Sequence, residues 1–244
     1  MTYCVGVCIK EGLVFASDSR TNAGIDHIAT FRKLVTFEKP GERVMVLLSA
    51  GNLATTQGVV TRLNQQIQDP TCDFSLFTAK SMYDATRHVS EVYRGILETD
   101  AAFVRAQHAD PGSDFIFGGQ IKGEPPYLAH IYSAGNFIAA MPETPFLQIG
   151  ETKYGKPIMD RITQYDISLA RAAKGALISF DSTMRSNLSV GLPIDMLCYR
   201  TDSLKIGSRV TIRENDPYFS NIRKRYGKGL YELFGRLPEP DWVG

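Results

Sequence analysis

Met1-Thr2-Tyr3-Cys4-Val5-Gly6-Val7-Cys8-Ile9 is the stretch around which the chain is organised. From Tyr3 to Ile9 the residues alternate with a period of two, which predicts a buried β-strand. If Met1 is removed, as the small Thr2 side chain permits, Thr2 carries both a hydroxyl and a free α-amine. That amine has a reference pKa of about 7.7–8.0, so it can act as the base that a weakly nucleophilic hydroxyl needs. The plain alternative is a start codon followed by an ordinary strand residue.

Composition narrows the class of protein. The chain has 244 residues and a net charge of +1. A nearly neutral chain has no field that attracts nucleic acid or an anionic membrane, so neither partner is predicted. No apolar run approaches the length of a membrane span, and no Pro/Gly/Ser-rich linker divides the chain. We therefore predict a single domain over residues 1–244 that ends in a helical tail.

The cysteines, the histidines and the first residues suggest a cellular location and exclude some chemistry. No signal peptide precedes the first strand, and the cysteines lack CxxC spacing, so reduced thiols in the cytoplasm are predicted. There is no HExxH motif and no glycine-rich phosphate loop, so no metal and no cofactor are predicted. The cysteines are Cys4, Cys8, Cys72 and Cys198, and the histidines are His27, His88, His108 and His130.

A hairpin is predicted at the start of the chain. Glu11-Gly12 is expected to form the turn, and residues 13–18 return as the second strand. In a tight hairpin the end of the second strand lies beside the start of the first. This places Asp18 close to Thr2.

The rest of the chain alternates between blocks of strands and blocks of helices. Apolar residues at period two or in short runs predict strands, and apolar residues at helical spacing predict helices. This order suits antiparallel sheets covered by helices on their outer faces, an α+β fold, with the tail from Asp216 capping it. Strands are predicted at 33–37, 44–48, 114–120, 127–132, 146–150, 193–199 and 206–212, and helices at 59–67, 76–97, 156–180 and beyond 216.

Four motifs together resemble the catalytic half of proteasome β-type subunits. They are Thr2 at the start of the first strand, Asp18-Ser19-Arg20-Thr21-Asn22-Ala23-Gly24 after the second, Lys33 at the third, and Ser49-Ala50-Gly51 at the end of the fourth. The bacterial two-component ATP-dependent threonine peptidase is similar in the same way. The start Thr-Tyr-Cys-Val-Gly, the long tail and the lack of a propeptide are most similar to the bacterial ancestral proteasome-like family Anbu. The resemblance implies a four-layer αββα sandwich of two antiparallel sheets, the N-terminal-nucleophile hydrolase fold.

The resemblance also implies a chemical role for each matched residue. The Thr2 hydroxyl would attack a carbonyl while its own amine takes the proton through a water. Lys33 would place a positive charge beside that hydroxyl, and Asp18 would keep the lysine charged and oriented. The backbone N–H of Gly51 would form the oxyanion hole.

A second set of positions is predicted to bind substrate. Thr21, Asn22 and Leu53 match positions at which an extended peptide pairs with the edge of the cleft. Arg20 and Glu151 are placed with them, although Arg20 can equally be a structural anchor of its loop. The catalytic positions have plainer alternatives too. Asp18 and Lys33 could form an ordinary ion pair, and Gly51 could serve only a tight turn.

The sequence departs from the proteasome pattern in two places. The family's Gly-Ser-Gly after a strand end is replaced here by Gly150-Glu151-Thr152, so a helper serine is missing and a negative charge stands in its place. The family's Asp and Ser before a glycine are also changed. Ser186 and Ser189 are expected to replace that pair, with no carboxylate aligned.

The predicted function is a threonine-type peptidase that acts through Thr2 after Met1 removal. A homo-oligomer, either a ring or an open spiral, would enclose its peptide or unfolded-protein substrate, and an ATPase partner is left open. Surfaces for neighbouring subunits are expected on the helical blocks 76–107 and 155–180 and on the aromatic tail. Two alternatives remain: a non-proteolytic amidase of the same fold, and a catalytically silent assembly protein.

Overall fold

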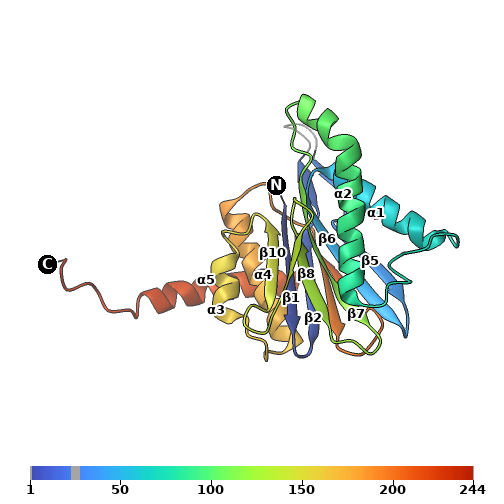
Figure 1. The fold of residues 1–244 in the computed structure, drawn as a ribbon. Coiled ribbons are helices and arrows are strands. Elements are labelled where there is room, and N and C mark those ends of the chain that lie inside the picture. Colours follow the sequence, from blue (N-terminus) through green and yellow to red (C-terminus); the bar gives the residue numbers. More distant parts are fainter. Residues whose placement is uncertain (1, 23–27, 244) are drawn as a thin grey trace.

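Two antiparallel five-stranded sheets face each other at the centre of the molecule (Figure 1). The computed structural model describes residues 2–22 and 28–243. In spatial order the first sheet contains β10 (Phe146–Gly150), β1 (Tyr3–Ile9), β2 (Gly12–Asp18), β11 (Ile194–Arg200) and β12 (Ser208–Ile212). The second contains β5 (Leu34–Lys39), β6 (Arg43–Gly51), β7 (Ser113–Ile121), β8 (Tyr127–Ile131) and β9 (Phe137–Ala139). A separate small hairpin joins β3 (Arg20–Asn22) to β4 (Ile28–Thr30).

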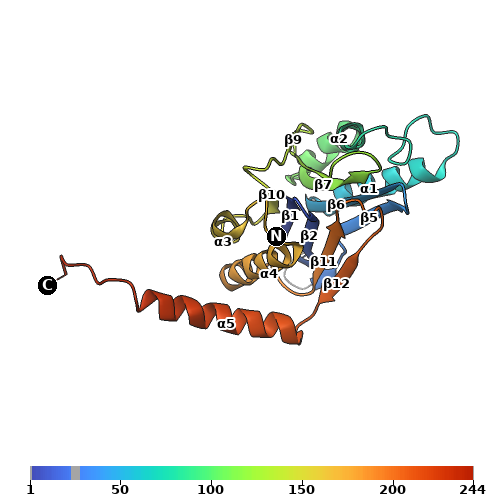
Figure 2. The same cartoon turned by 90° about the horizontal axis from the view of Figure 1, so that it is seen from below.

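Helices cover both outer faces of this pair of sheets, as Figure 2 shows. The second sheet is covered by α1 (Leu53–Gln68) and α2 (Met82–Ala106). The first sheet is covered by α3 (Lys156–Ile162) and α4 (Leu169–Ser186). The predicted four-layer αββα sandwich is therefore confirmed.

The alternation in the first two strands explains how both faces of the first sheet are buried. Tyr3 and Val5 of β1 pack with Phe180 of α4 in the outer core. Cys4 and, on β2, Phe15 point the other way and join the core between the two sheets. Both faces of the sheet are thus apolar, which is why each needs a covering layer.

The predicted hairpin forms, but its turn is Lys10-Glu11 and not Glu11-Gly12, because Gly12 already belongs to β2 and pairs with Ile9. Cys4 pairs with Ser17, so Asp18 returns beside the start of β1. Some boundaries differ from the prediction. Lys33 precedes β5 instead of beginning it, and α2 begins only at Met82, because Ser81 accepts the N–H of Asp84 and caps the helix there.

The predicted helix over 156–180 is wrong in its bounds. The chain forms two helices, and the segment between them includes Ile167, which is buried in the outer core. Ser168 caps the second helix by accepting the N–H of Arg171. That helix continues to Ser186, so Ser186 lies on a helix and not in the following loop.

The tail does not cap the fold as predicted. The last helix, α5 (Pro217–Phe234), begins in contact with α4 and then extends away from the body (Figures 1 and 2). The C-terminal residues continue beyond it. Among the described residues of α5, only Phe219 is buried. Arg223 donates to Asp181 of α4 at 2.5 Å, which ties the first two turns to the body. The periodicity is typical of an amphipathic helix, but the large apolar side chains of its C-terminal part, Leu230, Tyr231, Leu233 and Phe234, are exposed.

None of the helices in the described part of the chain is long and apolar enough to cross a membrane.

Candidate active site

A buried ion pair lies at the end of β2. Lys33 Nζ donates to Asp18 Oδ1 at 2.9 Å and to the carbonyl oxygen of Arg20 at 2.6 Å. The backbone N–H of Tyr3 also donates to Asp18 Oδ1, at 3.1 Å. The ammonium group is therefore fixed by two acceptors, one charged and one a backbone dipole.

Burial controls the ionisation of Asp18. It raises the pKa of this carboxyl above the usual value, while the nearby Lys33 ammonium and the Tyr3 N–H lower it. The second oxygen, Oδ2, has no hydrogen-bond partner among the described residues. Both donors favour the charged form of the carboxyl, so we interpret the pair as Asp18 carboxylate with Lys33 ammonium.

The start of β1 is held from both sides. On the β2 side, Tyr3 donates to Asp18, and on the β10 side the carbonyl oxygen of Thr2 accepts the N–H of Glu151 at 2.7 Å. Gly150 has φ of +79°, and a Cβ atom there would collide with the Thr2 carbonyl. Glycine at this position therefore allows β10 to end directly against Thr2.

Gly51 ends β6 in a conformation that other residues rarely adopt. Its φ is +119°, and a Cβ atom would lie 2.5 Å from the carbonyl oxygen of Gly112. Glycine is therefore required by the backbone here, as the plainer sequence alternative stated. This requirement does not exclude a role for the Gly51 N–H, because the residue is exposed and lines a cavity with Thr2.

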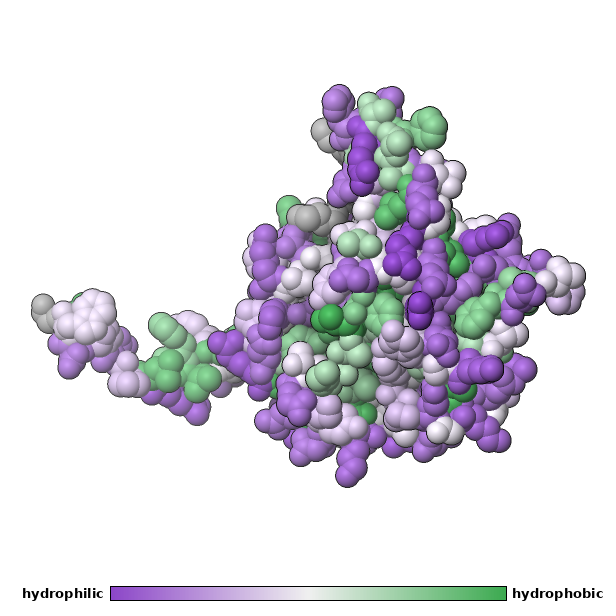
Figure 3. All heavy atoms as spheres, viewed as in Figure 1, coloured by the Kyte–Doolittle hydropathy of each residue, from purple (hydrophilic) through white to green (hydrophobic). Residues whose placement is uncertain are grey.

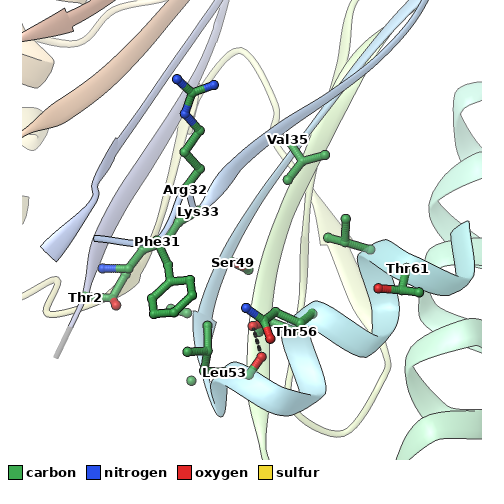
Figure 4. Close-up of a pocket in the computed structure, with 13 residues that line it drawn as sticks. Thr2, Phe31, Arg32, Lys33, Val35, Ser49, Leu53, Thr56 and Thr61 are labelled. Atoms are coloured by element: carbon green, nitrogen blue, oxygen red, sulfur yellow. Dashed lines mark hydrogen bonds between the residues drawn. The ribbon is translucent and has the colours of Figure 1, made fainter. Parts of the chain in front are cut away.

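That cavity has a volume of about 360 Å³. Figure 4 shows Thr2 and Lys33 on its wall, with Phe31 and Leu53 also lining it. The sequence prediction named Thr2, Lys33, Gly51 and Leu53, and all four contribute to the lining. The other lining residues are Phe31, Arg32, Val35, Ser49, Ala50, Thr56, Gln57, Val60 and Thr61.

The lining residues on α1 could have been found from the sequence. Starting from Leu53, positions three or four apart lie on one face of a helix, which gives Thr56 or Gln57 and then Val60 or Thr61. Thr56 donates its hydroxyl to the carbonyl oxygen of Leu53 at 3.0 Å. Phe31 and Val35 flank Lys33 in the chain, and no periodic signal distinguishes them.

Glu151 meets a residue that the sequence analysis did not name. Asn187 Nδ2 donates to Glu151 Oε2 at 2.6 Å, and Asn187 Oδ1 accepts the N–H of Ser189 at 2.9 Å. Lys153 pairs with the other Glu151 oxygen at 3.4 Å. A carboxylate–amide pair thus links the loop after β10 to the loop after α4.

The structure does not bring Ser186 and Ser189 to the cavity. Ser186 is exposed, and neither serine is among the residues described as lining it. Ser189 contributes its backbone N–H to the contact with Asn187. The position beside Glu151 is occupied by Asn187 instead. Because the two loops are distant in sequence, local patterning could not predict this pairing.

The remaining substrate-binding candidates lie around the β3–β4 hairpin. The Arg20 guanidinium donates to the carbonyl oxygen of Leu188 at 3.0 Å and lies against Gly191. This is the geometry of the loop anchor that the sequence analysis gave as its alternative. Thr21 and Asn22 lie in β3, and their side chains, like Ala23 and Gly24, fall outside the described residues.

Within residues 2–22 and 28–243, no group of three or more His, Cys, Asp or Glu side chains is placed to hold a metal ion.

A scan against family models finds no match, and a search of curated proteins finds none either. Solved structures are similar over almost the whole chain. Anbu (ancestral beta-subunit) from Yersinia bercovieri is 50% identical, with 99% of each chain covered and a TM-score of 0.92. The helical assembly of the Anbu complex from Pseudomonas aeruginosa is 52% identical, covering 99% of this chain and 100% of that one, with a TM-score of 0.94. Anbu from Hyphomicrobium sp. strain MC1 is 48% identical, covering 98% and 99%, with a TM-score of 0.89.

Half of the residues are identical to those of these proteins over nearly the full length, and the two facing sheets with their covering helices superpose. The chain belongs to the Anbu family of proteasome-like N-terminal-nucleophile hydrolases.

Proposed function

We propose that this protein hydrolyses peptide bonds through Thr2, once Met1 has been removed. The observation that carries the proposal is the Lys33 ammonium, fixed at 2.9 Å from Asp18 Oδ1 in the wall of the cavity that Thr2 also lines. A fixed positive charge next to a hydroxyl favours the alkoxide-like state that attacks a carbonyl.

Each group in the site has a task in this mechanism. The Thr2 hydroxyl attacks the scissile carbonyl, and the Thr2 α-amine takes its proton through a water and later passes it to the leaving amine. The N–H of Gly51 receives the oxyanion of the tetrahedral intermediate. A donor of this kind contributes roughly 3–4 kcal/mol of transition-state stabilisation. Water then releases the acyl group from Thr2.

The cavity suggests which side chain the substrate presents. Its wall includes the apolar Phe31, Val35 and Leu53, and no acidic side chain lies among the lining residues that the structure describes. A volume of about 360 Å³ accommodates one large side chain. We therefore expect a preference for apolar over basic residues next to the scissile bond.

The assembly is part of the same proposal. A related Anbu structure is a helical assembly, and we propose that this chain also forms a homo-oligomer. One 27.1 kDa subunit cannot enclose a chamber by itself, so screening of the site from folded proteins would require several copies. Whether a head-to-tail contact closes into a ring or continues as a spiral depends on its rotation.

A second candidate is a non-proteolytic amidase at the same site. It is favoured by Glu151, which stands in place of the helper serine and is bonded to Asn187 at 2.6 Å. A carboxylate close to the Thr2 amine would raise the amine's pKa and so change the pH range in which the amine acts as a base. Such a site could prefer a more reactive or smaller amide than a peptide bond.

The test is labelling of Thr2 with a peptide epoxyketone, which reacts with a hydroxyl and an amine on the same residue. Protein shown by intact mass to lack Met1 is expected to gain one adduct on the N-terminal peptide. Thr2→Ser should retain labelling and Thr2→Ala should lose it. Peptides and small amides then separate the peptidase from the amidase. An unlabelled protein that still assembles would make it a catalytically silent assembly protein.

A further inference from the structure

Asp195 is a buried carboxylate that is not among the residues lining the cavity. It lies on β11, between Ser17 of β2 and Thr211 of β12 in the sheet register, and only 4% of its surface is exposed. Its two oxygens each accept one hydroxyl. Ser19 Oγ donates to Oδ2 at 3.1 Å, and Thr211 Oγ1 donates to Oδ1 at 2.6 Å.

This carboxylate has no ion-pair partner in the part of the chain that the structure describes. A buried carboxylate without a cation is costly, and two hydroxyl donors compensate only part of that cost. An apolar residue would suit the centre of a sheet better for stability alone. The role of Asp195 therefore depends on the two hydroxyls from which it accepts hydrogen bonds, those of Ser19 and Thr211.

Ser19 is held at the corner between β2 and β3. Its backbone N–H donates to the carbonyl oxygen of Pro193 at 2.9 Å, and its own carbonyl accepts the N–H of Phe31 at 3.1 Å. With the side-chain bond to Asp195, three hydrogen bonds fix this one residue. Phe31 lines the cavity, so one of the three reaches the cavity wall directly.

The two acceptors of Lys33 lie on either side of Ser19 in the chain. They are Oδ1 of Asp18, the preceding residue, and the carbonyl oxygen of Arg20, the following residue. A rotation of the chain at Ser19 would move the Arg20 carbonyl away from Lys33. It would also change the direction in which the Asp18 side chain leaves β2.

We infer that Asp195 is a positioning residue for the Lys33 ammonium. It acts through Ser19, whose hydroxyl it accepts, and so holds the two groups that fix Lys33 beside Thr2. The inference rests on the proposed function for its link to catalysis, but its structural part, from Asp195 through Ser19 to Lys33, is independent of any turnover.

The test compares loss of each of the two hydroxyls that Asp195 accepts. Ser19→Ala removes the hydroxyl of the residue that lies between the two acceptors of Lys33. Thr211→Val removes the hydroxyl on β12, at the edge of the sheet. Both variants leave the Asp195 side chain in place. Ser19→Thr restores a hydroxyl at the first position and serves as the conservative rescue. Asp195→Asn completes the set, and if it fails to fold, Ser19→Ala decides the inference alone.

Two measurements are made on each protein. The first is the rate constant of epoxyketone labelling at Thr2. The second is the rate of acetylation of Lys33 by trace acetic anhydride, followed by peptide mass spectrometry. The Lys33 ammonium is buried and bound to two acceptors, so it should react slowly with acetic anhydride. A variant in which these acceptors are displaced should expose the ammonium and speed its acetylation.

We expect Ser19→Ala to slow Thr2 labelling at least tenfold and to speed Lys33 acetylation at least threefold, with Ser19→Thr close to wild type. Thr211→Val should stay within twofold of wild type in both. Wild-type rates in Ser19→Ala, or equal effects of Ser19→Ala and Thr211→Val, would overturn the inference. If wild-type Thr2 is never labelled, the proposed function fails, and Lys33 acetylation still decides whether Asp195 positions this lysine.

Discussion

Lys33 Nζ lies 2.9 Å from Asp18 Oδ1, with 9% of the lysine side chain and none of the aspartate side chain exposed. A pair this deeply buried differs from a surface ion pair, because removal of one partner leaves the other as an uncompensated buried charge that destabilises the fold. The carbonyl oxygen of Arg20 accepts a second hydrogen bond from Lys33 Nζ, at 2.6 Å. The charge at the cavity wall is thus in place before any substrate arrives, which is the condition for electrostatic preorganisation.

The first prediction concerns this pair. Lys33→Ala should abolish epoxyketone labelling of Thr2, because it removes the cation from the site. It should also lower the free energy of unfolding by about 3 kcal/mol, because the Asp18 carboxyl stays buried without its partner. Asp18→Asn should weaken labelling less, since Lys33 keeps its charge. Labelling rates and urea unfolding measure both effects.

Lys39→Ala is the matched control for Lys33→Ala. Lys39 pairs with Glu42 at 2.5 Å, but 54% of its side chain is exposed. Exposed ion pairs contribute little to stability, so the rate of Thr2 labelling and the free energy of unfolding should both stay at wild-type values. A Lys33→Ala protein that is labelled at the wild-type rate would move the active centre away from this cavity.

The second prediction separates backbone strain from steric collision at Gly51. Gly51→Ala places a methyl group 2.5 Å from the carbonyl oxygen of Gly112, at a φ of +119°. The end of β6 must then move, and we expect loss of labelling together with a stability loss of at least about 2 kcal/mol. Gly41→Ala has a similarly unfavourable φ of +77°, but nothing lies within 4 Å of the added methyl group. Gly41→Ala should lower the free energy of unfolding by about 1 kcal/mol and leave Thr2 labelling unchanged. Equal effects of both substitutions on labelling would contradict this reading of the Gly51 backbone.

The third prediction concerns Cys4, which lies in the same tryptic peptide as Thr2. Burial raises the pKa of the Cys4 thiol well above its usual value, Asp18 raises it further, and Lys33 acts in the opposite direction. The thiolate is the reactive form, so at pH 8 the thiol stays protonated and should resist iodoacetamide. Burial raises the pKa of Cys8 to about 11, and it should resist as well. Both should be alkylated once the chain is unfolded in urea.

This result decides how an adduct on the N-terminal peptide is assigned. Native protein treated with iodoacetamide before the epoxyketone should still gain the full adduct, which then belongs to Thr2. Rapid alkylation of native Cys4 would mean that this thiol competes as the nucleophile.

Much of the fold follows from local patterns in the sequence. The alternation in β1 and the short turn that follows it determine the hairpin, although the turn lies at Lys10-Glu11, one residue before the predicted Glu11-Gly12. The hairpin places Asp18 at the start of β1. The motif resemblance added Lys33 and Gly51, and both line the cavity with Thr2. The hairpin could be predicted because it depends on a short segment, and the positions of Lys33 and Gly51 on the cavity wall could be anticipated from several motifs that match in order. Their catalytic roles stay predictions.

The features that were not predicted depend on contacts between distant segments. Asn187 reaches Glu151 across 36 positions of the chain. Ser19 reaches Asp195 across 176 positions. A single polar residue carries no periodic signal, so its partner is visible only in the folded chain. The same holds for the tail, because a helical pattern in the sequence does not specify which surface packs against the apolar face of the helix.

The fourth prediction is that activity requires removal of Met1. Only then is the Thr2 amine free to act as the base, and only then can an epoxyketone react with both the hydroxyl and the amine. Preparations that differ by the mass of one methionine should therefore differ completely in labelling, while their circular dichroism spectra and melting temperatures agree. Full labelling at Thr2 in protein that retains Met1 would exclude the N-terminal amine as the base.

The fifth prediction concerns assembly. Light scattering is expected to show a homo-oligomer at micromolar concentration and physiological salt, and a monomer under these conditions would contradict self-compartmentalisation. The C-terminal half of α5 and the residues after it expose large apolar side chains, which Figure 3 shows on the protruding tail. Exposed apolar surface on this scale is typical of a protein interface. The exposed residues are Leu230, Tyr231, Leu233, Phe234, Leu237, Trp242 and Val243.

A chain that ends at Tyr226 tests whether this tail contributes to assembly. It keeps Phe219 in the core and the bond between Arg223 and Asp181, so the melting temperature of the body should hardly change. The oligomer should become smaller, because the apolar surface that a neighbour would bury is gone. Leu233→Ser/Phe234→Ser in the full-length chain should have the same effect, while Lys228→Ala on the same helix should not. An unchanged particle mass in both tail variants would place the subunit contacts elsewhere, on the outer faces of α1 and α2 or of α3 and α4.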